Sequence, residues 1–367
     1  MRIIHCSDLH LDADLKSKYD AASAAERRAE LLDTFRRLCR YAREEDVSAI
    51  LICGDLFDTA SPSPSAVRTV EDLILGNSEI LFFYLRGNHD ERPMLFRTRP
   101  RPDNLYLFSD DWTSWELSDG REYGRRICIA GREPSNAVFT SPELDPSCIN
   151  IVMLHGQVRE GYTVPDPESV PLGALRGRGI DYLALGHFHH YRSFALDERG
   201  SAAYCGCLEG RGFDECGRCG FILIETDESA HPLRTRFVPF ASRSLYCIDC
   251  PVTGCCSDTE VYERISRVLK ASPASDEDLV RLTLTGEMEY TCSPDASFIS
   301  KEWEGRYHYF ELKDSTEPVI HSEDFLCDAT LKGEFVRVVN AACGLKDRER
   351  TRILRCGLRA LLGESLF

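Results

Sequence analysis

The stretch EILFFYLRGNHD, residues Glu79–Asp90, is an apolar run that stops abruptly on polar residues. Its first part, Ile80–Leu85, is continuously apolar, which is typical of a strand buried on both faces of a parallel sheet. The motif GNHD follows almost at once, and Gly87 allows the chain to turn sharply there. The next three side chains carry an amide, an imidazole and a carboxylate. The stretch therefore predicts a core strand with chemical groups at its carboxyl end.

Four other apolar runs in the first part of the chain also end in polar groups. The five endings are SDLH at Ser7–His10, GDLFD at Gly54–Asp58, GNHD at Gly87–Asp90, HG at His155–Gly156 and GHFHH at Gly186–His190. The first three runs alternate with two amphipathic, helix-like stretches, which predicts a β-α-β-α-β start and a parallel sheet. Ligands collect at the carboxyl ends of the strands in such sheets. We therefore expect the five endings to meet at one rim.

The side chains at these endings are hard oxygen donors and imidazoles. None of the five endings contains a cysteine, and a set of carboxylates, one amide and several imidazoles suits Mn²⁺, Fe²⁺ or Zn²⁺. Magnesium alone would use fewer histidines. In Asp8-x-His10 and His187-x-His189 an extended backbone would put both side chains on the same side, where they can reach one metal pair. The sequence thus predicts a divalent-metal centre.

The composition is typical of a soluble globular protein. The net charge is −16, and the start MRIIHCSDLH has neither a basic segment nor a long apolar one. We therefore expect a cytoplasmic protein without a signal peptide or a membrane anchor. The 17 cysteines are expected to be reduced thiols used as small core residues. Structural zinc is the alternative for two groups, Cys205/Cys207 with Cys216/Cys219 and Cys247/Cys250 with Cys255/Cys256.

The later parts of the chain have a different character. Gln157–Arg178 is rich in proline, glycine and charge, and is predicted to be a surface loop. Between Ser257 and Leu312 helix-like and strand-like stretches alternate, which predicts a small α+β module. Two amphipathic stretches at Gly333–Ala342 and Lys346–Leu362 predict terminal helices. Their apolar stripes either bind a partner or pack within the chain.

The ordered motifs DxH, GDxxD, GNHD, HG and GHxH resemble those of the calcineurin-like metallophosphoesterases over about residues 1–240. Finer features resemble the SbcD/YhaO branch, the nuclease subunits of bacterial DNA-repair complexes. They are GDLFD, IDYLALGHFHH, YCGCLEGRGFDE at Tyr204–Glu215 and LRCGLRALLGE near the C-terminus. The resemblance implies an α/β fold, namely a four-layer α-β-β-α sandwich with a small C-terminal α+β capping module and terminal helices. The expected domains are residues 1–245, 246–325 and 326–367.

The resemblance also implies a role for each residue of the expected site. One divalent metal would be held by Asp8, His10, Asp55 and His189, and the second by Asp55, Asn88, His155 and His187. His89 would be the catalytic residue that faces the phosphate, and Asp58 and Asp90 would orient the ligands or His89. Arg92 and Arg211 are candidate contacts to the substrate. Mn²⁺ is the expected metal, with Fe²⁺, Zn²⁺ and Mg²⁺ as alternatives.

By the same resemblance we expect a metal-dependent phosphodiesterase that acts on DNA. It would be a 3′–5′ exonuclease with single-strand endonuclease action, the nuclease subunit of an SbcCD-like repair complex. Its partners would be DNA, a long coiled-coil ATPase of the SbcC type and a second copy of the chain, without involvement of a membrane. A phosphatase or phosphodiesterase for small nucleotides is the alternative, and a non-catalytic scaffold is the third hypothesis.

Overall fold

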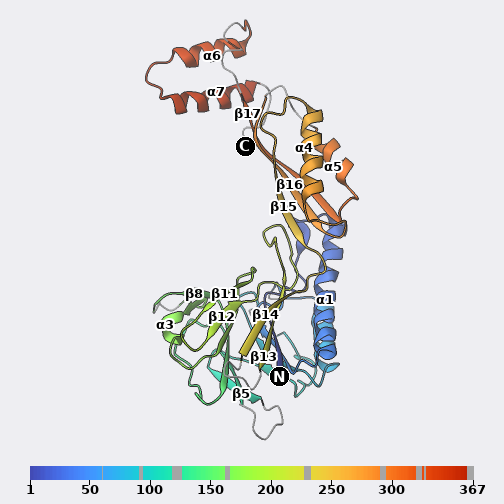
Figure 1. The fold of residues 1–367 in the computed structure, drawn as a ribbon, viewed down its shortest axis with the longest axis vertical. Coiled ribbons are helices and arrows are strands. Elements are labelled where there is room, and N and C mark those ends of the chain that lie inside the picture. Colours follow the sequence, from blue (N-terminus) through green and yellow to red (C-terminus); the bar gives the residue numbers. More distant parts are fainter. Residues whose placement is uncertain are drawn as a thin grey trace. The chain divides into compact units, whose positions relative to one another are not determined.

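A computed structural model of the chain describes residues 1–59, 61–90, 94–117, 126–161, 166–226, 233–289, 295–319, 325 and 328–361 (Figure 1). The chain divides into two compact units, Met1–Leu245 and Tyr246–Phe367. All five polar strand endings lie in the first unit.

The first unit contains two six-stranded mixed sheets. The first sheet has the order β14-β13-β1-β2-β3-β4, in which β1 to β4 run parallel and β13 and β14 are antiparallel to their neighbours. Its strands are β1 (Arg2–Cys6), β2 (Ala49–Cys53), β3 (Leu81–Leu85), β4 (Leu105–Leu107), β13 (Gly220–Thr226) and β14 (Leu233–Pro239). Inner parallel strands are buried on both faces, which is why β2 reads AILIC with no polar residue.

The second sheet has the order β11-β12-β10-β7-β6-β5. Its four inner strands run parallel, and the edge strands β11 and β5 are antiparallel to their neighbours. The strands are β5 (Thr113–Leu117), β6 (Ile127–Gly131), β7 (Ile149–His155), β10 (Tyr182–Gly186), β11 (Arg192–Ala195) and β12 (Ser201–Tyr204). An antiparallel edge strand can be more polar and more exposed than the buried parallel strands beside it, and β11 is an example.

The two sheets face each other across one apolar core. Leu51 of the first sheet and Ile151 of the second are both fully buried members of this core. Val152, the next residue along β7, belongs instead to a second cluster on the other face of its sheet, because side chains alternate along a strand. That second cluster includes residues of the short helix α3 (Leu172–Leu175).

Two longer helices connect the first three strands. They are α1 (Ala21–Glu44), which follows the short 3₁₀ turn η1 (Leu15–Ser17), and α2 (Pro64–Leu75). The Asp20 carboxylate caps α1, and the Ser63 hydroxyl caps α2 just before a proline at the first helical position. Tyr41 packs against Phe221 of β13 with ring centroids 5.2 Å apart, which holds α1 on the first sheet.

The structure confirms the mixed α/β class and corrects one local prediction. The prediction of a surface loop over Gln157–Arg178 is wrong, because this segment contains β8 (Gln157–Arg159), β9 (Ser169–Pro171) and α3. All three residues of β9 are buried. A strand of three residues is too short to show a regular alternation of apolar and polar residues in the sequence. The prediction therefore followed the high content of proline, glycine and charged residues. The four-layer order with a capping module stays a prediction.

Where its residues are described, the second unit has a three-stranded sheet and four helices. The sheet order is β15-β16-β17, formed by β15 (Leu245–Pro251), β16 (Leu279–Glu289) and β17 (Tyr309–Val319). The helices α4 (Asp258–Ala271) and α5 (Ala296–Trp303) contribute to one apolar cluster with this sheet, whereas α6 (Leu331–Ala341) and α7 (Asp347–Leu361) form a separate cluster. The assignment of 246–325 and 326–367 as separate domains stays a prediction. No helix in the described ranges is long and apolar enough to cross a membrane.

Candidate metal centre

The carboxyl ends of five parallel strands lie together at one rim of the first unit. β1, β2 and β3 are neighbours in the first sheet, and β7 and β10 are neighbours in the second. The two sheets touch at these ends, because His155 of β7 places its Nδ1 2.9 Å from the Cys53 carbonyl oxygen of β2. The five polar endings therefore converge, as the sequence predicted.

Six of the seven expected metal ligands form one cluster: Asp8, His10, Asp55, Asn88, His155 and His189. The Nε2 atoms of His10 and His189 lie 3.2 Å apart. The Nε2 atom of His155 lies 2.9 Å from Asn88 Oδ1 and 3.5 Å from Asp55 Oδ2. Two groups of ligand atoms, Asp8–His10–His189 and Asp8–Asp55–His155, are each close enough together to hold one ion.

His187, the seventh expected ligand, contacts the cluster in another way. Its backbone N–H donates to both carboxylate oxygens of Asp8, at 3.0 and 3.1 Å. Its ring lies edge-on to the ring of His155, with centroids 5.4 Å apart. Burial, and then the neighbouring His155, lower the pKa of His187, which favours the neutral imidazole that a metal ion requires. Its role as a ligand stays a prediction.

Several residues of the cluster have left-handed backbone conformations. The φ angles of Asp8, His10, Asp55 and His187 are 53°, 45°, 51° and 104°. The expectation that the DxH motif is extended is therefore wrong, because both of its outer residues lie in tight turns. Such conformations cost about 1–3 kcal/mol each and cluster at functional sites. Backbone hydrogen bonds from Asp8 to Gly54 and from His10 to Asp55 hold these turns in place.

Two glycines allow the strand ends to approach each other. A Cβ atom at Gly186 would lie 1.8 Å from the Cys53 carbonyl oxygen, and one at Gly87 would lie 2.1 Å from Asp55 Oδ1. Neither distance is physically accessible to a carbon atom, so any other residue would push the chains apart. These glycines let β10 lie against β2, and the GNHD turn lie against Asp55.

The hydrogen bonds of the imidazoles show that the cluster suits a cation. The Nδ1 atoms of His10 and His189 lie 2.9 Å from Asp58 Oδ1 and 2.7 Å from Glu215 Oε1. The Glu215 carboxylate only accepts hydrogen bonds, so Nδ1 of His189 carries a proton, and the neutral form of this ring has a lone pair on Nε2. With both rings neutral and protonated on Nδ1, the two Nε2 lone pairs would face each other 3.2 Å apart, an arrangement that a cation between them would stabilise. This arrangement is the one that metal-binding histidines adopt.

The region around His155 leads to the same conclusion. Its Nδ1 faces the Cys53 carbonyl, which can only accept, so the Nε2 lone pair of the neutral ring faces the oxygens of Asn88 and Asp55. The carboxylates of Asp8 and Asp55 are at most 2% exposed. Buried carboxylates are unstable without a compensating positive charge. The residues present therefore fit divalent cations at this cluster.

Glu215 is a residue of the site to which the sequence analysis gave no role. Its carboxylate accepts from His189 Nδ1 and from the Arg211 guanidinium, both at 2.7 Å, and from the Arg211 backbone N–H at 2.6 Å. Burial opposes ionisation, but these contacts prevail and lower the pKa of Glu215 well below its ordinary value. It lies in the YCGCLEGRGFDE stretch, which was the available signal.

Asp58 lies near two histidines of the site, and its expected role in orienting them stays a prediction. Its Oδ1 lies 2.9 Å from His10 Nδ1 and 3.9 Å from His89 Nδ1, and it accepts from Arg211 at 2.6 Å. Burial would raise the pKa of Asp58, but the contacts with His10 and Arg211 outweigh burial and lower it. Asp58 is therefore ionised beside the cluster and can fix the ring of His10.

His89 and Asp90 differ in their surroundings. The His89 side chain is 44% exposed, and its ring stands edge-on to that of His10 with centroids 4.9 Å apart. Asp90 is buried, and its carboxylate accepts the backbone N–H groups of Leu56 and Phe57, both at 2.9 Å. Asp90 therefore holds the GDLFD turn against the GNHD turn. His89 remains the accessible imidazole of the site.

The two arginines expected to contact substrate are placed differently. Arg92 lies outside the described residues. Arg211 is described, but its guanidinium pairs with Asp58 at 2.6 Å and with Glu215 at 2.7 Å, and its side chain is 12% exposed. These contacts give it a positioning role, and substrate binding by Arg211 stays a prediction. Cys205 and Cys207 of the same stretch are fully buried, and no cysteine belongs to a potential metal-binding group in the described part of the chain.

A comparison with family models supports the same assignment. Residues 1–191, more than half of the 367-residue chain, match the calcineurin-like phosphoesterase family. The matched segment contains every expected metal ligand and the described Asp/His cluster. The chain therefore belongs to the calcineurin-like phosphoesterases, and it is a metal-dependent hydrolase of phosphoesters.

Proposed function

We propose that this enzyme cleaves phosphodiester bonds in DNA, as a 3′–5′ exonuclease that also acts as an endonuclease on single strands. In this proposal it is the nuclease subunit of an SbcCD-like repair complex and works with a long coiled-coil ATPase. The SbcD/YhaO-like stretch Tyr204–Glu215 is the observation that carries the proposal, because its polar side chains are built into the metal centre.

Each end of this stretch supports one part of the centre. The Tyr204 hydroxyl donates to the carbonyl of Gly156 at 2.8 Å and accepts from the Val158 N–H at 2.9 Å, so it holds the turn that follows His155. At the other end, Arg211 and Glu215 hold Asp58 and His189. The polar side chains of this SbcD/YhaO-like stretch therefore support the site, which favours the proposal.

A buried ion pair anchors the middle of the stretch. Glu209 is 2% exposed and accepts from the Arg27 guanidinium at 3.1 Å, the Thr34 hydroxyl at 2.9 Å and the Ser242 N–H at 2.6 Å. Arg27 and Thr34 belong to α1. Breaking a buried pair of this kind costs about 3–5 kcal/mol. The stretch is thus fixed to the first long helix, which favours a fixed position of Arg211 relative to the centre.

In the proposed mechanism the chain contributes the metal ligands and a proton that His89 exchanges with the substrate. The expected ligands Asp8, His10, Asp55, Asn88, His155, His187 and His189 would hold divalent cations, Mn²⁺ in our proposal, which would stabilise the charge of the phosphate and lower the pKa of water. His89 lies beside the cluster with its Nδ1 3.4 Å from the Asp58 carbonyl oxygen. When Nδ1 donates there, Nε2 is the nitrogen that exchanges a proton with the leaving oxygen. In this proposal Asp58 keeps the rings of His10 and His89 oriented for the proton transfer.

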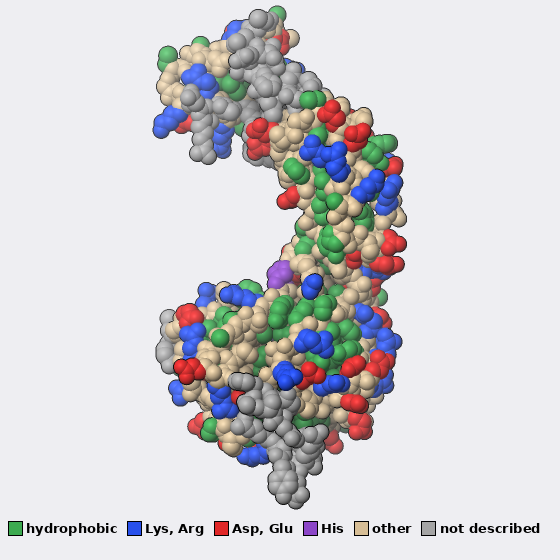
Figure 2. Space-filling model, viewed as in Figure 1, with side chains coloured by type: hydrophobic (Ala, Val, Ile, Leu, Met, Phe, Trp, Pro, Cys, Tyr) green, Lys and Arg blue, Asp and Glu red, His purple; other side chains and the backbone are tan. Residues whose placement is uncertain are grey.

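A specific observation favours the alternative, a phosphodiesterase for small nucleotides. Three arginines near the site or on the same unit are engaged in ion pairs: Arg211 with Asp58, Arg86 with Glu133 and Arg99 with Asp72. On the face shown in Figure 2, Lys and Arg side chains alternate with Asp and Glu and do not gather in one patch. A DNA footprint in this protein would therefore be short and depend mainly on the bound metals.

The substrate experiment separates these two functions. Purified full-length protein with Mn²⁺ is assayed on end-labelled linear duplex, on single-stranded DNA and on cyclic nucleotides, with EDTA as the control. The proposal expects stepwise loss of nucleotides from the 3′ end and little turnover of cyclic nucleotides. Turnover of cyclic nucleotides with intact DNA would favour the alternative.

The partner part of the proposal concerns the terminal helices. Leu331 and Val338 of α6 are 69% and 59% exposed, and Ile353 of α7 is 40% exposed. These apolar side chains suit a docking surface for the ATPase. Co-purification of a tagged ATPase with the full chain, and its loss on deletion of residues 326–367, is the expected result. Unchanged co-purification of the truncated chain would remove this assignment.

A further inference from the structure

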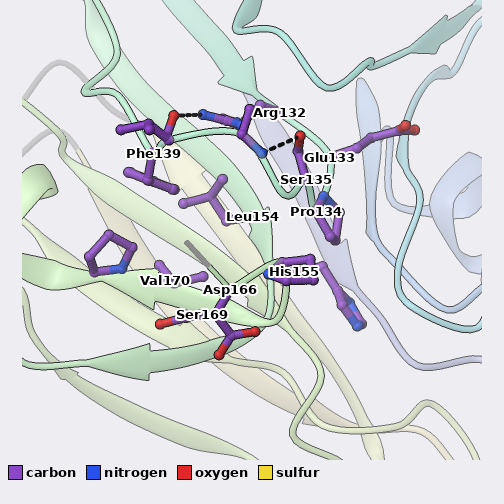
Figure 3. Close-up of a pocket in the computed structure, with 14 residues that line it drawn as sticks. Arg132, Glu133, Pro134, Ser135, Phe139, Leu154, His155, Asp166, Ser169 and Val170 are labelled. Carbon is purple, nitrogen blue, oxygen red and sulfur yellow. Dashed lines mark hydrogen bonds between the residues drawn. The ribbon is translucent and has the colours of Figure 1, made fainter. Parts of the chain in front are cut away.

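A cavity of about 180 Å³ lies beside the metal centre and has no role in the mechanism above (Figure 3). Its walls come from the turn that follows β6, from the end of β7 and from β9. His155 lines the cavity, while its two ring nitrogens contact Cys53 and Asn88 of the metal centre. The cavity therefore adjoins the centre through His155.

Arg132 is a buried cation in this wall, and it has no ion pair with a carboxylate in the described part of the chain. The residue is 5% exposed. In the described ranges its one side-chain hydrogen bond goes to the Val138 carbonyl at 3.5 Å, which is long. Its guanidinium carbon lies 5.3 Å from the centroid of the Phe139 ring. Burial lowers the pKa of Arg132, although the nearby Asp111 and Asp110 oppose this. A desolvated guanidinium with unused donors is a binding site for an anion.

The acidic side chains that line the cavity do not supply this anion. Glu133 is held by Arg86, whose Nε lies 2.9 Å from both of its carboxylate oxygens. In Figure 3 the Glu133 carboxylate extends away from Arg132. Asp166 is exposed, and its carboxylate accepts the backbone N–H of Glu168 at 3.0 Å. The donors of Arg132 are therefore open to a ligand from outside.

The rest of the lining is mostly apolar and suits a planar ring. Phe139, Pro134, Leu154 and Val170 face the cavity with Arg132. One water molecule needs only about 10–15 Å³ of such space, so the cavity is many times larger than one water needs. Its size and its chemistry match a small group with one anionic end and one flat apolar end.

We propose that this cavity binds a phosphomonoester that carries a planar ring, with the phosphate on Arg132 and the ring against Phe139 and the apolar wall. A guanidinium binds a phosphate through two parallel hydrogen bonds, and it also stacks on rings. A nucleoside monophosphate is the simplest ligand of this class. The choice of class rests on the proposed function, because cleavage of a phosphodiester leaves a phosphomonoester, but binding itself requires no metal.

The test measures binding in the absence of catalysis. Full-length protein in EDTA is titrated by calorimetry with adenosine 5′-monophosphate, with inorganic phosphate and with adenosine. We expect the monophosphate to bind more tightly than either part alone. The variant R132Q should lower its affinity tenfold or more, because it removes a charge-assisted pair of hydrogen bonds. The matched control is R126Q, which removes one arginine charge from an exposed ion pair with Glu116 and should leave the affinity unchanged.

A second variant guards against loss of folding in R132Q. Val138 lines the cavity and is 72% exposed, so V138E places a competing carboxylate near Arg132 with little risk to the core. It should abolish binding of the monophosphate while the melting temperature stays that of the wild type. The proposal is overturned if metal-free wild type binds no monophosphate, or if adenosine or phosphate alone binds as tightly. Unchanged affinity in both R132Q and V138E would also overturn it. Because no metal is present, these results are independent of whether DNA is the substrate.

Discussion

Replacement of Glu215 by glutamine tests whether the metal centre depends on a residue outside the five motifs. The Glu215 side chain is 1% exposed, and its two oxygens accept from His189, from the Arg211 guanidinium and from the Arg211 N–H. A glutamine keeps one oxygen but turns its NH₂ group toward one of these donors. It also removes the negative charge between Arg211 and His189.

The magnitude follows from these contacts. A hydrogen bond to a charged group contributes about 1.5–3 kcal/mol, and loss of one partner of a buried ion pair costs about 3–5 kcal/mol. Asp58 still pairs with Arg211 in the variant, so we expect E215Q to lose about 3 kcal/mol of unfolding free energy. His189 loses the acceptor that fixes its Nδ1 proton, and a loss of this kind lowers metal affinity about 10–100-fold.

The assay is titration of metal-free protein with Mn²⁺, followed by urea denaturation of the same samples. The matched control is D214N, which removes the adjacent carboxylate; that side chain is 67% exposed and pairs with Lys18. D214N should bind Mn²⁺ as the wild type does. Equal Mn²⁺ affinity of E215Q and D214N would refute the reasoning, because His189 would then not need Glu215.

The same residue gives a pH dependence of stability. The pKa of Glu215 is lowered in the folded protein from an ordinary value of 4.5. A depressed carboxyl pKa stabilises the folded state fully above the unfolded value, and this contribution is lost as the pH falls through the folded value. Wild-type protein should therefore lose more unfolding free energy than E215Q as the pH falls below about 4.5. Parallel curves for the two proteins would contradict this.

Three further predictions concern catalysis, packing and metal binding. H89A should bind Mn²⁺ with wild-type affinity but lose turnover by about 10²–10⁴-fold, measured as kcat on a phosphodiester; normal turnover would exclude His89 as the proton donor. G186A should lose about 3 kcal/mol or more of unfolding free energy in urea denaturation, because its Cβ would lie 1.8 Å from the Cys53 carbonyl oxygen. The control G177A, at an open position with φ +71°, should lose about 1 kcal/mol. Equal losses in the two variants would contradict the close approach of the strands at Gly186. Burial lowers the pKa of His189, but Glu215 and Asp8 raise it overall above the ordinary value of 6.5. Protons should therefore compete with Mn²⁺, and the Mn²⁺ affinity should already fall at a pH above 6.5 as the solution is acidified, which calorimetry at several pH values would test.

Much of the first unit was predictable because its strands are buried on both faces. The predicted core strand Ile80–Leu85 matches β3, Leu81–Leu85, to within one residue. Continuous apolar sequence bounded by glycine and charge is a strong local signal. By contrast, β9 was missed because three residues carry no period, and its burial comes from Val170 packing on the face of another sheet.

The polar side chains of the site were predictable by type but not by conformation. Asp8, His10 and Asp55 were expected from their motifs, yet their left-handed backbones were not. An aspartate or histidine adopts such a conformation when hydrogen bonds from another strand end hold it, here from His10 to the Asp55 carbonyl. The contacts of Asp90 with Leu56 and Phe57 are of the same kind, because they join two turns that are distant in sequence.

The sequence by itself determined the strand ends, the donor types and their order along the chain, since these follow from local patterns of apolar and polar residues. Tertiary structure alone decided which supports the donors receive. Glu215 accepts a hydrogen bond from His189, and Arg132 donates to the Val138 carbonyl and has no ion pair with a carboxylate among the described residues. The sequence does not show whether a charged residue forms an ion pair. Its partner, its burial and therefore its pKa depend on segments that meet only in the folded chain.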